Sequence, residues 1–152
     1  MVTLIPLDHE NRSFLEGTSY AAMDPQSIEA MVDESIAGEH EGAFFRLFAV
    51  IEGDVPVGII NMYSPSRSVI NVGPEIREEH RRNGYAFQAY RKALQLAAEM
   101  GYTDAFAVVR SENEASIALH RKLGFTEAAQ LLTRSGKPVS VFVLNLLSGT
   151  LF

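Results

Sequence analysis

The chain has 152 residues, of which 47% are hydrophobic and 21% charged, with a formal net charge of −6 and no cysteine; this length suits one domain over residues 1–152. The acidic charge argues against general nucleic-acid binding, and the absence of cysteine excludes disulfides, thiolate metal sites and a cysteine nucleophile. No apolar run approaches the roughly 20 residues that cross a bilayer, and the first residues lack the basic start and small-residue cleavage site of a signal peptide, so we expect a cytoplasmic protein that binds neither nucleic acid nor membrane.

The first half of the chain alternates between strand and helix patterns. In order, it predicts a strand over residues 3–7, a helix around 8–17, a helix from 24 to about 37, and strands over 44–51 and 55–63. Asp24 and Pro25 are a helix cap followed by a first-turn proline, and Gly38 ends that helix. A turn at residues 52–54 joins the two later strands into a hairpin.

The second half predicts a strand–helix–strand unit followed by a helix and a hairpin. These elements cover residues 69–77, 84–100, 103–110, 113–123, and the pair 125–133 and 139–146. Gly73 and Pro74 interrupt the first strand and predict an edge or a bulge, because proline cannot donate to a strand ladder. The strand–helix–strand unit requires two parallel strands, whereas the hairpins are antiparallel. We therefore expect a mixed sheet flanked by helices.

The most informative segment is the basic turn at residues 81–86, Arg-Arg-Asn-Gly-Tyr-Ala. It directly precedes an apolar helix, whose start concentrates unpaired backbone N–H groups and the positive end of the helix dipole. Gly84 would let an anion approach that backbone closely, and the two arginines add full charges. The turn therefore predicts a site for a phosphate or pyrophosphate.

Two segments resemble the GCN5-related N-acetyltransferase (GNAT) family. Residues 81–86 fit that family's R/Q-x-x-G-x-G/A loop for acetyl-CoA, and residues 113–125 are similar to its N-x-x-[AS]-…-L-Y-x-K-x-G-F segment. The order of the predicted elements is similar over the whole chain. The resemblance implies an α/β (α+β) fold, with a mixed, mostly antiparallel sheet of about seven strands, a central splayed parallel pair and about four helices. A generic phosphate binder would leave the second segment unexplained, and the chain lacks a P-loop pattern.

The resemblance implies acetyl-CoA as cosubstrate. The loop at residues 81–86 would hold its pyrophosphate, and the pantetheine arm would lie between the strand end at 75–77 and the strand at 107–110, which splay apart. Asn113 would bond the pantetheine or a bridging water. The residues implied in cofactor binding are Ile76, Arg77, Arg81, Arg82, Asn83, Gly84, Tyr85, Ala86, Asn113 and Ser116.

His120 stands where the family commonly has a tyrosine that protonates the departing coenzyme A thiolate. Histidine can also donate a proton, and its ordinary pKa of about 6.5 suits proton transfer near neutral pH. It is shorter than tyrosine, however, and the alternative is a side chain that simply packs beside Leu119 and Leu123. The sequence leaves both roles for His120 open.

The implied reaction is direct attack by an amine on the thioester, so some group has to remove a proton from the amine. Glu75, at the end of its strand, is the candidate general base, unless it faces solvent or the phosphate loop. Asn71 shares its face by alternation and could orient a water. Tyr63 is either part of an acceptor pocket or part of the core, and the loop at residues 39–41 either attracts an amine or is simply solvated.

The resemblance predicts an acetyl-CoA-dependent N-acetyltransferase that acts on a primary amine, in a small molecule or at a protein N-terminus. The alternative is a catalytically weakened acyl-CoA-binding module that acts as a sensor or interaction partner, because His120 departs from the family pattern. We expect no metal, since no His, Asp or Glu cluster has ligand spacing. The apolar segment 146–152 would pack on the chain's own core or on a second subunit of a homodimer.

Overall fold

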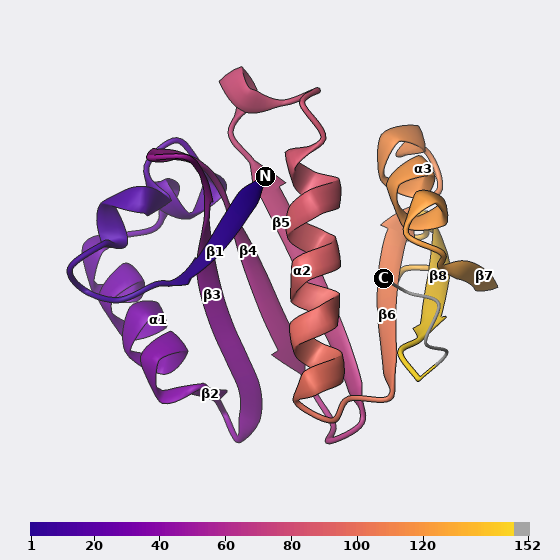
Figure 1. Cartoon of the computed structure of the whole chain (residues 1–152). Coiled ribbons are helices and arrows are strands. Elements are labelled where there is room, and N and C mark those ends of the chain that lie inside the picture. The colour runs from indigo at the N-terminus through magenta and orange to yellow at the C-terminus, as the bar shows by residue number, and fades with distance from the viewer. Residues whose placement is uncertain (148–152) are drawn as a thin grey trace.

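The computed structural model describes residues 1–147, so most of the apolar C-terminal segment lies outside the described residues (Figure 1). The elements are, in chain order, β1 (Val2–Pro6), η1 (Arg12–Leu15), η2 (Ser19–Ala22), α1 (Pro25–Ala37), β2 (Glu39–His40), β3 (Ala43–Glu52), β4 (Val55–Ser64), β5 (Val69–Ile76), η3 (Glu78–His80), α2 (Tyr85–Glu99), β6 (Asp104–Arg110), α3 (Glu114–Lys122), β7 (Thr126–Leu132) and β8 (Pro138–Asn145). No helix among the described residues is long and apolar enough to cross a membrane.

All the strands belong to one sheet, in the order β1-β3-β4-β5-β6-β8-β7, with the short β2 paired to β3. The pairings are antiparallel except for that of β5 with β6, which is parallel. The helix α2 connects these two parallel strands and crosses the face of the sheet in front of them (Figure 1). The predicted mixed sheet with a central parallel pair is confirmed.

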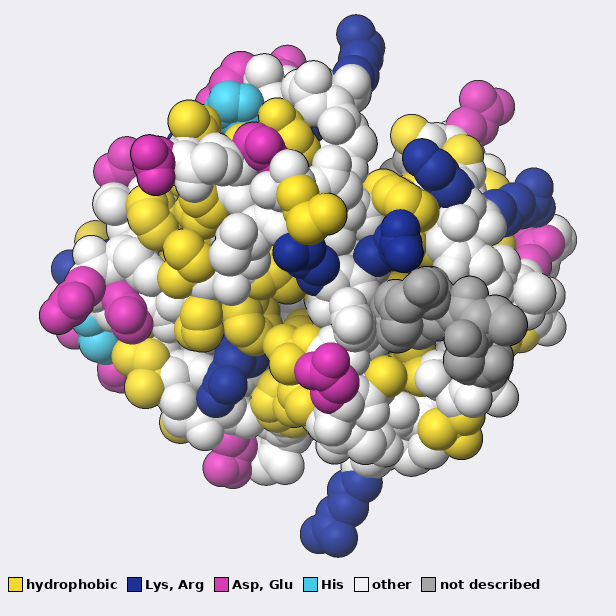
Figure 2. All heavy atoms as spheres, in the orientation of Figure 1, with side chains coloured by type: hydrophobic (Ala, Val, Ile, Leu, Met, Phe, Trp, Pro, Cys, Tyr) yellow, Lys and Arg dark blue, Asp and Glu magenta, His cyan; other side chains and the backbone are white. Residues whose placement is uncertain are grey.

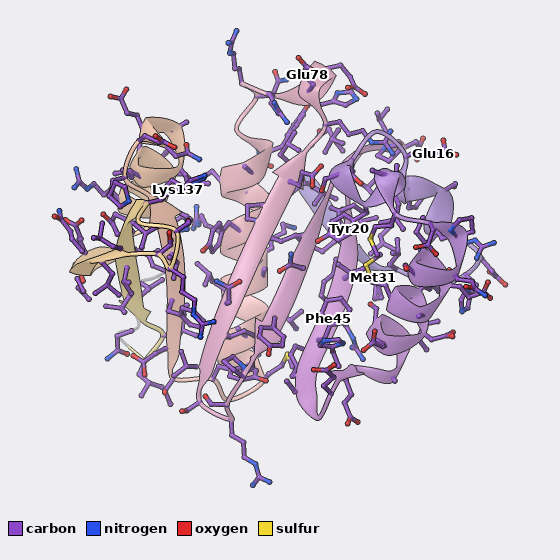
Figure 3. All side chains as sticks on the ribbon, turned by 180° about the vertical axis from the view of Figure 1, so that it is seen from behind. Glu16, Tyr20, Met31, Phe45, Glu78 and Lys137 are labelled. Atoms are coloured by element: carbon purple, nitrogen blue, oxygen red, sulfur yellow. The ribbon has the colours of Figure 1, made fainter. Side chains whose placement is uncertain are left out.

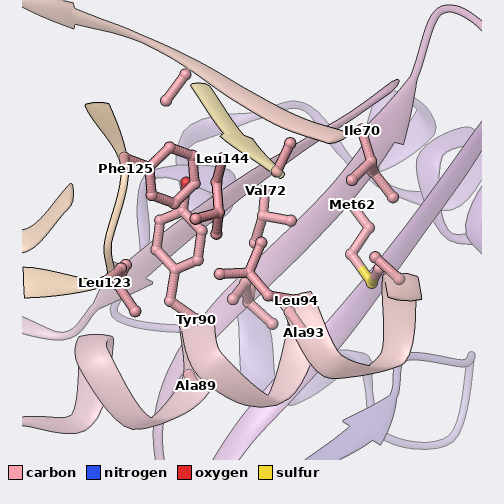
Figure 4. Packing of buried hydrophobic residues seen from close by; sticks show 14 of the residues in the cluster. Met62, Ile70, Val72, Ala89, Tyr90, Ala93, Leu94, Leu123, Phe125 and Leu144 are labelled. Atoms are coloured by element: carbon pink, nitrogen blue, oxygen red, sulfur yellow. The ribbon is translucent and has the colours of Figure 1, made fainter. Parts of the chain in front are cut away.

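Helices cover both faces of the sheet, and each face buries its own apolar cluster. On one face α2 packs on β1, β4 and β5, and Tyr90 and Leu94 of α2 lie in one cluster with Val72 of β5 (Figure 4). On the other face α1 packs on β3, and its Val32 clusters with Leu47. Strand alternation explains this division, because successive side chains of a strand point to opposite faces.

The helix predicted around residues 8–17 is wrong, since the chain forms only the short 3₁₀ helices η1 and η2 in this region. The Asp8 side chain accepts the backbone N–H groups of Glu10 and Asn11, both at 2.9 Å. The Asn11 side chain in turn bonds to the Asp8 N–H and the Pro6 carbonyl. Side chains that bond to nearby backbone in this way compete with helix formation.

β5 runs through Gly73 and Pro74 without a bulge. Its register with β4 is continuous, with Ile60 opposite Pro74. The Arg77 N–H donates to the Val57 carbonyl of β4, so strand alternation turns the Pro74 nitrogen to the β6 side. Pairing with β6 has already ended there, so a residue without an N–H forfeits no ladder hydrogen bond. The sequence predicted either a strand edge or a bulge at Gly73 and Pro74, and the structure has a strand edge there.

Candidate active site

The strands β5 and β6 separate part of the way along their length. They pair only from Val69 with Asp104 to Asn71 with Phe106, whereas β5 stays paired with β4 as far as Ile76 and β6 stays paired with β8 as far as Arg110. At the last pair the Asn71 side-chain amide donates to the Phe106 carbonyl at 3.0 Å. The structure therefore has the splay that the family resemblance implied.

A cleft of about 570 Å³ lies beside this splay, between the end of β5, the loop before α2, and α3. It brings together residues far apart in the sequence, and its lining includes the predicted Glu75, Ile76, Arg81, Arg82, Gly84, Tyr85, Ala86, Asn113, Ser116 and His120. Figure 2 shows this face notched between the parts that carry α2 and α3, with Lys and Arg side chains on both sides. We refer to this site as the β5–α3 cleft.

The start of α2 faces the β5–α3 cleft with an open N-terminus. Gly84 caps the helix in the left-handed conformation, with φ of +77°, and contributes no side-chain cap. The first helical hydrogen bond runs from the Gln88 N–H to the Gly84 carbonyl, which leaves the N–H groups of the first turn without an intrahelical acceptor. Arg82 is also left-handed, with φ of +66°, a strained conformation that is typical of functional loops. These N–H groups and the helix dipole are suited to an anion.

The charges that line the cleft are mostly positive. Arg81, Arg82 and Lys122 line it with His80, against the single carboxylate of Glu75 among the described lining residues. The sequence interpretation did not assign Lys122 to the site. Its ammonium lies 4.3 Å from the centre of the Phe87 ring of α2, so the pair bridges the two helices beside the cleft. Lys122 lies within the motif at residues 113–125, but only the fold shows that this end of α3 reaches the cleft.

Two predicted cofactor-binding residues do not line the cleft. The Arg77 guanidinium donates to the Phe14 carbonyl at 3.0 Å, and its stem lies against Gly17. The Asn83 side-chain amide donates to the carbonyls of His80 and Arg81, at 3.0 and 3.2 Å. Arg77 therefore holds the η1 loop against the end of β5, and Asn83 shapes the basic turn from within.

His120 is buried and has both ring nitrogens engaged. Its Nδ1 lies 2.7 Å from the Ser116 carbonyl, which can only accept, so Nδ1 carries the proton and Nε2 is an acceptor. The Tyr90 hydroxyl then donates to Nε2 across 3.0 Å. Burial lowers the pKa of His120, although the Ser116 carbonyl opposes this. The geometry favours the packing role for His120 over proton donation, because its one N–H points into its own helix.

Glu75 and Asn113 line the cleft but also hold the local structure. The two oxygens of Glu75 accept from the backbone N–H and the hydroxyl of Ser19, at 2.6 and 2.5 Å. This carboxylate therefore anchors η2 to the end of β5, and an amine would have to share it with Ser19. The Asn113 side-chain oxygen caps α3 by accepting the Ser116 N–H at 3.1 Å, so its amide group is the part that could reach a ligand.

Other predicted residues belong to a second pocket, on the opposite face of the sheet. This pocket, also about 570 Å³, lies between α1 and strands β3 to β5, and its lining includes Tyr63, Asn71 and His40. We call it the α1 pocket. The loop residues Glu39 and Glu41 are not among its lining residues. Both sites include residues of β5: Asn71, at the end of the β5–β6 pairing, lines the α1 pocket, and Pro74 to Ile76 line the β5–α3 cleft. Among residues 1–147, no group of three acidic, His or Cys side chains could hold a metal ion.

Comparisons with solved structures place the fold among acetyltransferases. A chimera of the spermidine N-acetyltransferase SpeG from Vibrio cholerae and hSSAT has a TM-score of 0.81 and 18% identity, with 95% of each chain covered. RimL, a ribosomal alpha-N-protein acetyltransferase in complex with coenzyme A, has a TM-score of 0.78 and 14% identity, over 95% of this chain and 93% of that chain. The yncA protein from Salmonella typhimurium, with its cofactor acetyl-CoA, has a TM-score of 0.76 and 18% identity, over 97% and 95%.

The sequence itself also matches a known family. No curated protein sequence matches the chain, but the family model described as an acetyltransferase (GNAT) domain matches residues 8–126. That span includes the basic turn, both splayed strands and the whole of α3. The protein therefore belongs to the acetyltransferase (GNAT) domain family.

Proposed function

We propose that the protein transfers the acetyl group of acetyl-CoA to a primary amine. The observation that supports this most directly is the β5–α3 cleft, in which an open helix start and basic side chains lie next to the end of β5, with which no strand among residues 1–147 pairs on its β6 side. An anionic group fits the helix start with its basic side chains, and an extended arm with amide groups fits the strand edge. The structural neighbours include enzymes named for spermidine and for a ribosomal protein alpha-amine, and both of these acceptors carry a primary amino group.

In this proposal the basic turn binds the pyrophosphate of acetyl-CoA. The backbone N–H groups of Tyr85 and Ala86 and the side chains of Arg81 and Arg82 would bind its oxygens. The pantetheine arm would lie along β5 from Pro74 to Ile76 and form the hydrogen bonds that β6 does not. Asn113 and Ser116 line the same cleft from α3.

Acetyl-CoA supplies a reactive thioester, so the protein has to remove one proton from the amine and provide one for the departing sulfur. The neutral amine nitrogen bonds to the thioester carbon, the carbon–sulfur bond breaks, and the nitrogen loses one proton while the sulfur gains one. Glu75 is the carboxylate that lines the cleft and is the candidate acceptor of the amine proton. His120 offers no free N–H to the sulfur, so we assign proton delivery to water. Holding both reactants in one site supplies much of the acceleration in such a transfer.

A second function has a specific observation in its favour. Both candidate catalytic side chains are already engaged, Glu75 with Ser19 and His120 with Tyr90. A protein that binds acyl-CoA tightly but transfers slowly would tolerate such engagement, and it would act as a sensor or interaction partner. This function predicts tight cofactor binding without amine-dependent release of coenzyme A.

Thermal melting tests the cofactor site first. A ligand at about 100 times its Kd raises the free energy of unfolding by about 2.7 kcal/mol, which raises the Tm of a protein of this size by several degrees. We expect acetyl-CoA and coenzyme A to raise the Tm and ATP to do so much less. Release of free thiol is then measured with and without a primary amine. Amine-dependent release supports the transferase, stabilisation without release supports the binding module, and no stabilisation by either coenzyme A species contradicts both.

A further inference from the structure

The floor of the α1 pocket is a row of side chains that crosses the sheet. Phe45 of β3 lies opposite Tyr63 of β4, which lies opposite Asn71 of β5, and all three line the pocket. Neighbouring strands are about 4.8 Å apart, so the row is about 10 Å long. Its Asn71 end lies where β5 and β6 separate. A ligand that lies along the row would therefore have one end beside the splay and the other end at Phe45.

The chemistry of the pocket changes along this row. At the Asn71 end the lining is polar and uncharged, with Asn61 beside Asn71; the Asn61 amide donates to the Tyr20 hydroxyl at 3.0 Å. Toward the other end Met31 of α1 lies near Phe45 (Figure 3), and both pack on the same apolar cluster; Met23 and Ala30 are further apolar lining residues. One end can accept hydrogen bonds from an amine, and the rest favours hydrocarbon.

The far end of the pocket is closed by an ion pair. The His40 ring lies edge-on to Phe45, with ring centres 6.2 Å apart, and its Nδ1 is hydrogen-bonded to the Glu34 carboxylate. Its Nε2 lies 3.8 Å from the carboxylate of the exposed Glu41. The Glu34 hydrogen bond raises the pKa of His40, so this ring keeps its proton to a higher pH than a free histidine does. Glu34 is the one carboxylate among the described residues that line the α1 pocket, and it already has a cationic partner.

We propose that the α1 pocket selects primary amines carried on an uncharged apolar body of about six carbons, with the amine at Asn71 and the body along Met31 and Phe45. This proposal rests on the proposed acetyltransferase function. A second ammonium at the far end would lose water against Phe45, and Glu34, the carboxylate that lines the described pocket, is already paired with His40. A carboxylate there would meet Glu34, and no Lys or Arg lines the described pocket to bind it. An alkylamine and a peptide with an apolar first residue share the selected chemistry.

Three amines of equal length test the proposal: n-hexylamine, the diamine 1,6-diaminohexane and the amino acid 6-aminohexanoate. We expect n-hexylamine to be acetylated with a catalytic efficiency about tenfold or more above that of either other compound, because each of these carries a second charge into the apolar end. From n-propylamine to n-hexylamine we expect about a fourfold gain per methylene. Equal or better use of the diamine would overturn the proposal. Tripeptides that begin with leucine or lysine test whether the acceptor is a peptide and not an alkylamine. If it is a peptide, the one that begins with leucine should be favoured.

A binding measurement separates failure of this proposal from failure of the proposed function. With coenzyme A in place of acetyl-CoA no transfer occurs, and the amine-dependent rise in Tm reports binding alone. Stabilisation by n-hexylamine and not by the diamine would support the pocket assignment even if acetyl transfer were absent. Transfer to amines with no preference among the three would support the function and overturn the pocket.

Two histidine variants provide the matched comparison. In His40→Ala the partner of Glu34 is gone and its carboxylate is free to bind a second ammonium, so we expect the catalytic efficiency with the diamine, relative to that with n-hexylamine, to rise about two- to fivefold, the size of a half-exposed ion pair. His9 also pairs with an acid of α1, at 2.7 Å from Asp33, but lies outside the pocket lining. His9→Ala should leave the ratio unchanged. A ratio that does not move in His40→Ala would overturn the role of the ion pair as the selective element.

Discussion

The Tyr90 hydroxyl donates to Nε2 of His120 across 3.0 Å, and neither residue is exposed by more than 6%. Tyr90 belongs to α2 and His120 to α3, so this bond joins the two helices that flank the β5–α3 cleft. Phe125 packs edge-on against both rings, with centres 5.7 and 5.1 Å away. A position where the family pattern has tyrosine therefore holds a histidine whose polar partner is a tyrosine on the neighbouring helix.

A double-mutant cycle measures that bond. Tyr90→Phe leaves the Nε2 acceptor buried without a donor and should reduce the free energy of unfolding by about 1–2 kcal/mol; His120→Phe leaves the Tyr90 hydroxyl unpaired and should cost about 1–3 kcal/mol. The double variant removes both polar groups, so its cost should fall short of the sum by about 1 kcal/mol. Urea denaturation provides all three values, and strict additivity would contradict the bond.

The same variants decide between the two roles of His120. If it only packs, Tyr90→Phe and His120→Phe should each retain the single-turnover rate of acetyl transfer within about threefold. A general acid is typically worth about 100-fold or more, so a loss of that size in His120→Phe alone would mark His120 as the proton donor. Single-turnover transfer from acetyl-CoA to n-hexylamine is the appropriate measurement, because it excludes product release.

The stability of the protein should depend on pH through His120. Burial lowers the pKa of His120 in the folded state, whereas in the unfolded chain it has its usual value of about 6.5. Between these values the unfolded state binds more protons, so stability rises with pH there. The stability that neutral His120 contributes is fully present above about pH 6.5 and is lost as the pH falls toward the lowered pKa of the folded state. Urea denaturation at about pH 7.5 and 5.5 should show a larger loss for the wild type than for His120→Phe; equal losses would contradict the assignment.

Most of the predicted site residues line one cleft, and they could be grouped from the sequence because they come in short local units. The basic turn at residues 81–86 and the start of α3 at Asn113 are each set by neighbours within a few residues, and a single crossover brings them together. The roles of Glu75 and Arg77 could not be predicted in this way. Their partners, Ser19 and Phe14, are 56 and 63 positions away along the chain. Phe14 belongs to η1, within the residues 8–17 that were predicted to be one helix, and Ser19 belongs to η2, just beyond that range, so nothing local indicated either contact.

The arginines of the basic turn should dominate cofactor affinity. Arg81→Ala and Arg82→Ala should each weaken coenzyme A binding by about 10- to 100-fold, the value of a charge-assisted hydrogen bond to phosphate. Isothermal titration calorimetry measures this, and the effect should shrink at high salt. The matched control is Arg67→Ala, since this exposed arginine lies in the β4–β5 loop and outside the cleft lining. A similar loss in Arg67→Ala would show that the effect comes from net charge.

The end of β5 owes its position to Gly58 of β4, which lies opposite Ile76. A Cβ at Gly58 would lie 2.3 Å from the Glu75 carbonyl oxygen, whereas one at Gly73 would approach the Asn61 side-chain amide at 3.1 Å, which can rotate. Gly58→Ala should therefore cost about 1–3 kcal/mol of stability and weaken coenzyme A binding, because β5 must shift where it lines the cleft. Gly73→Ala should cost less. Urea denaturation and calorimetry of both variants test this, and a Gly58→Ala protein with unchanged affinity would show that the strand end does not bind the cofactor.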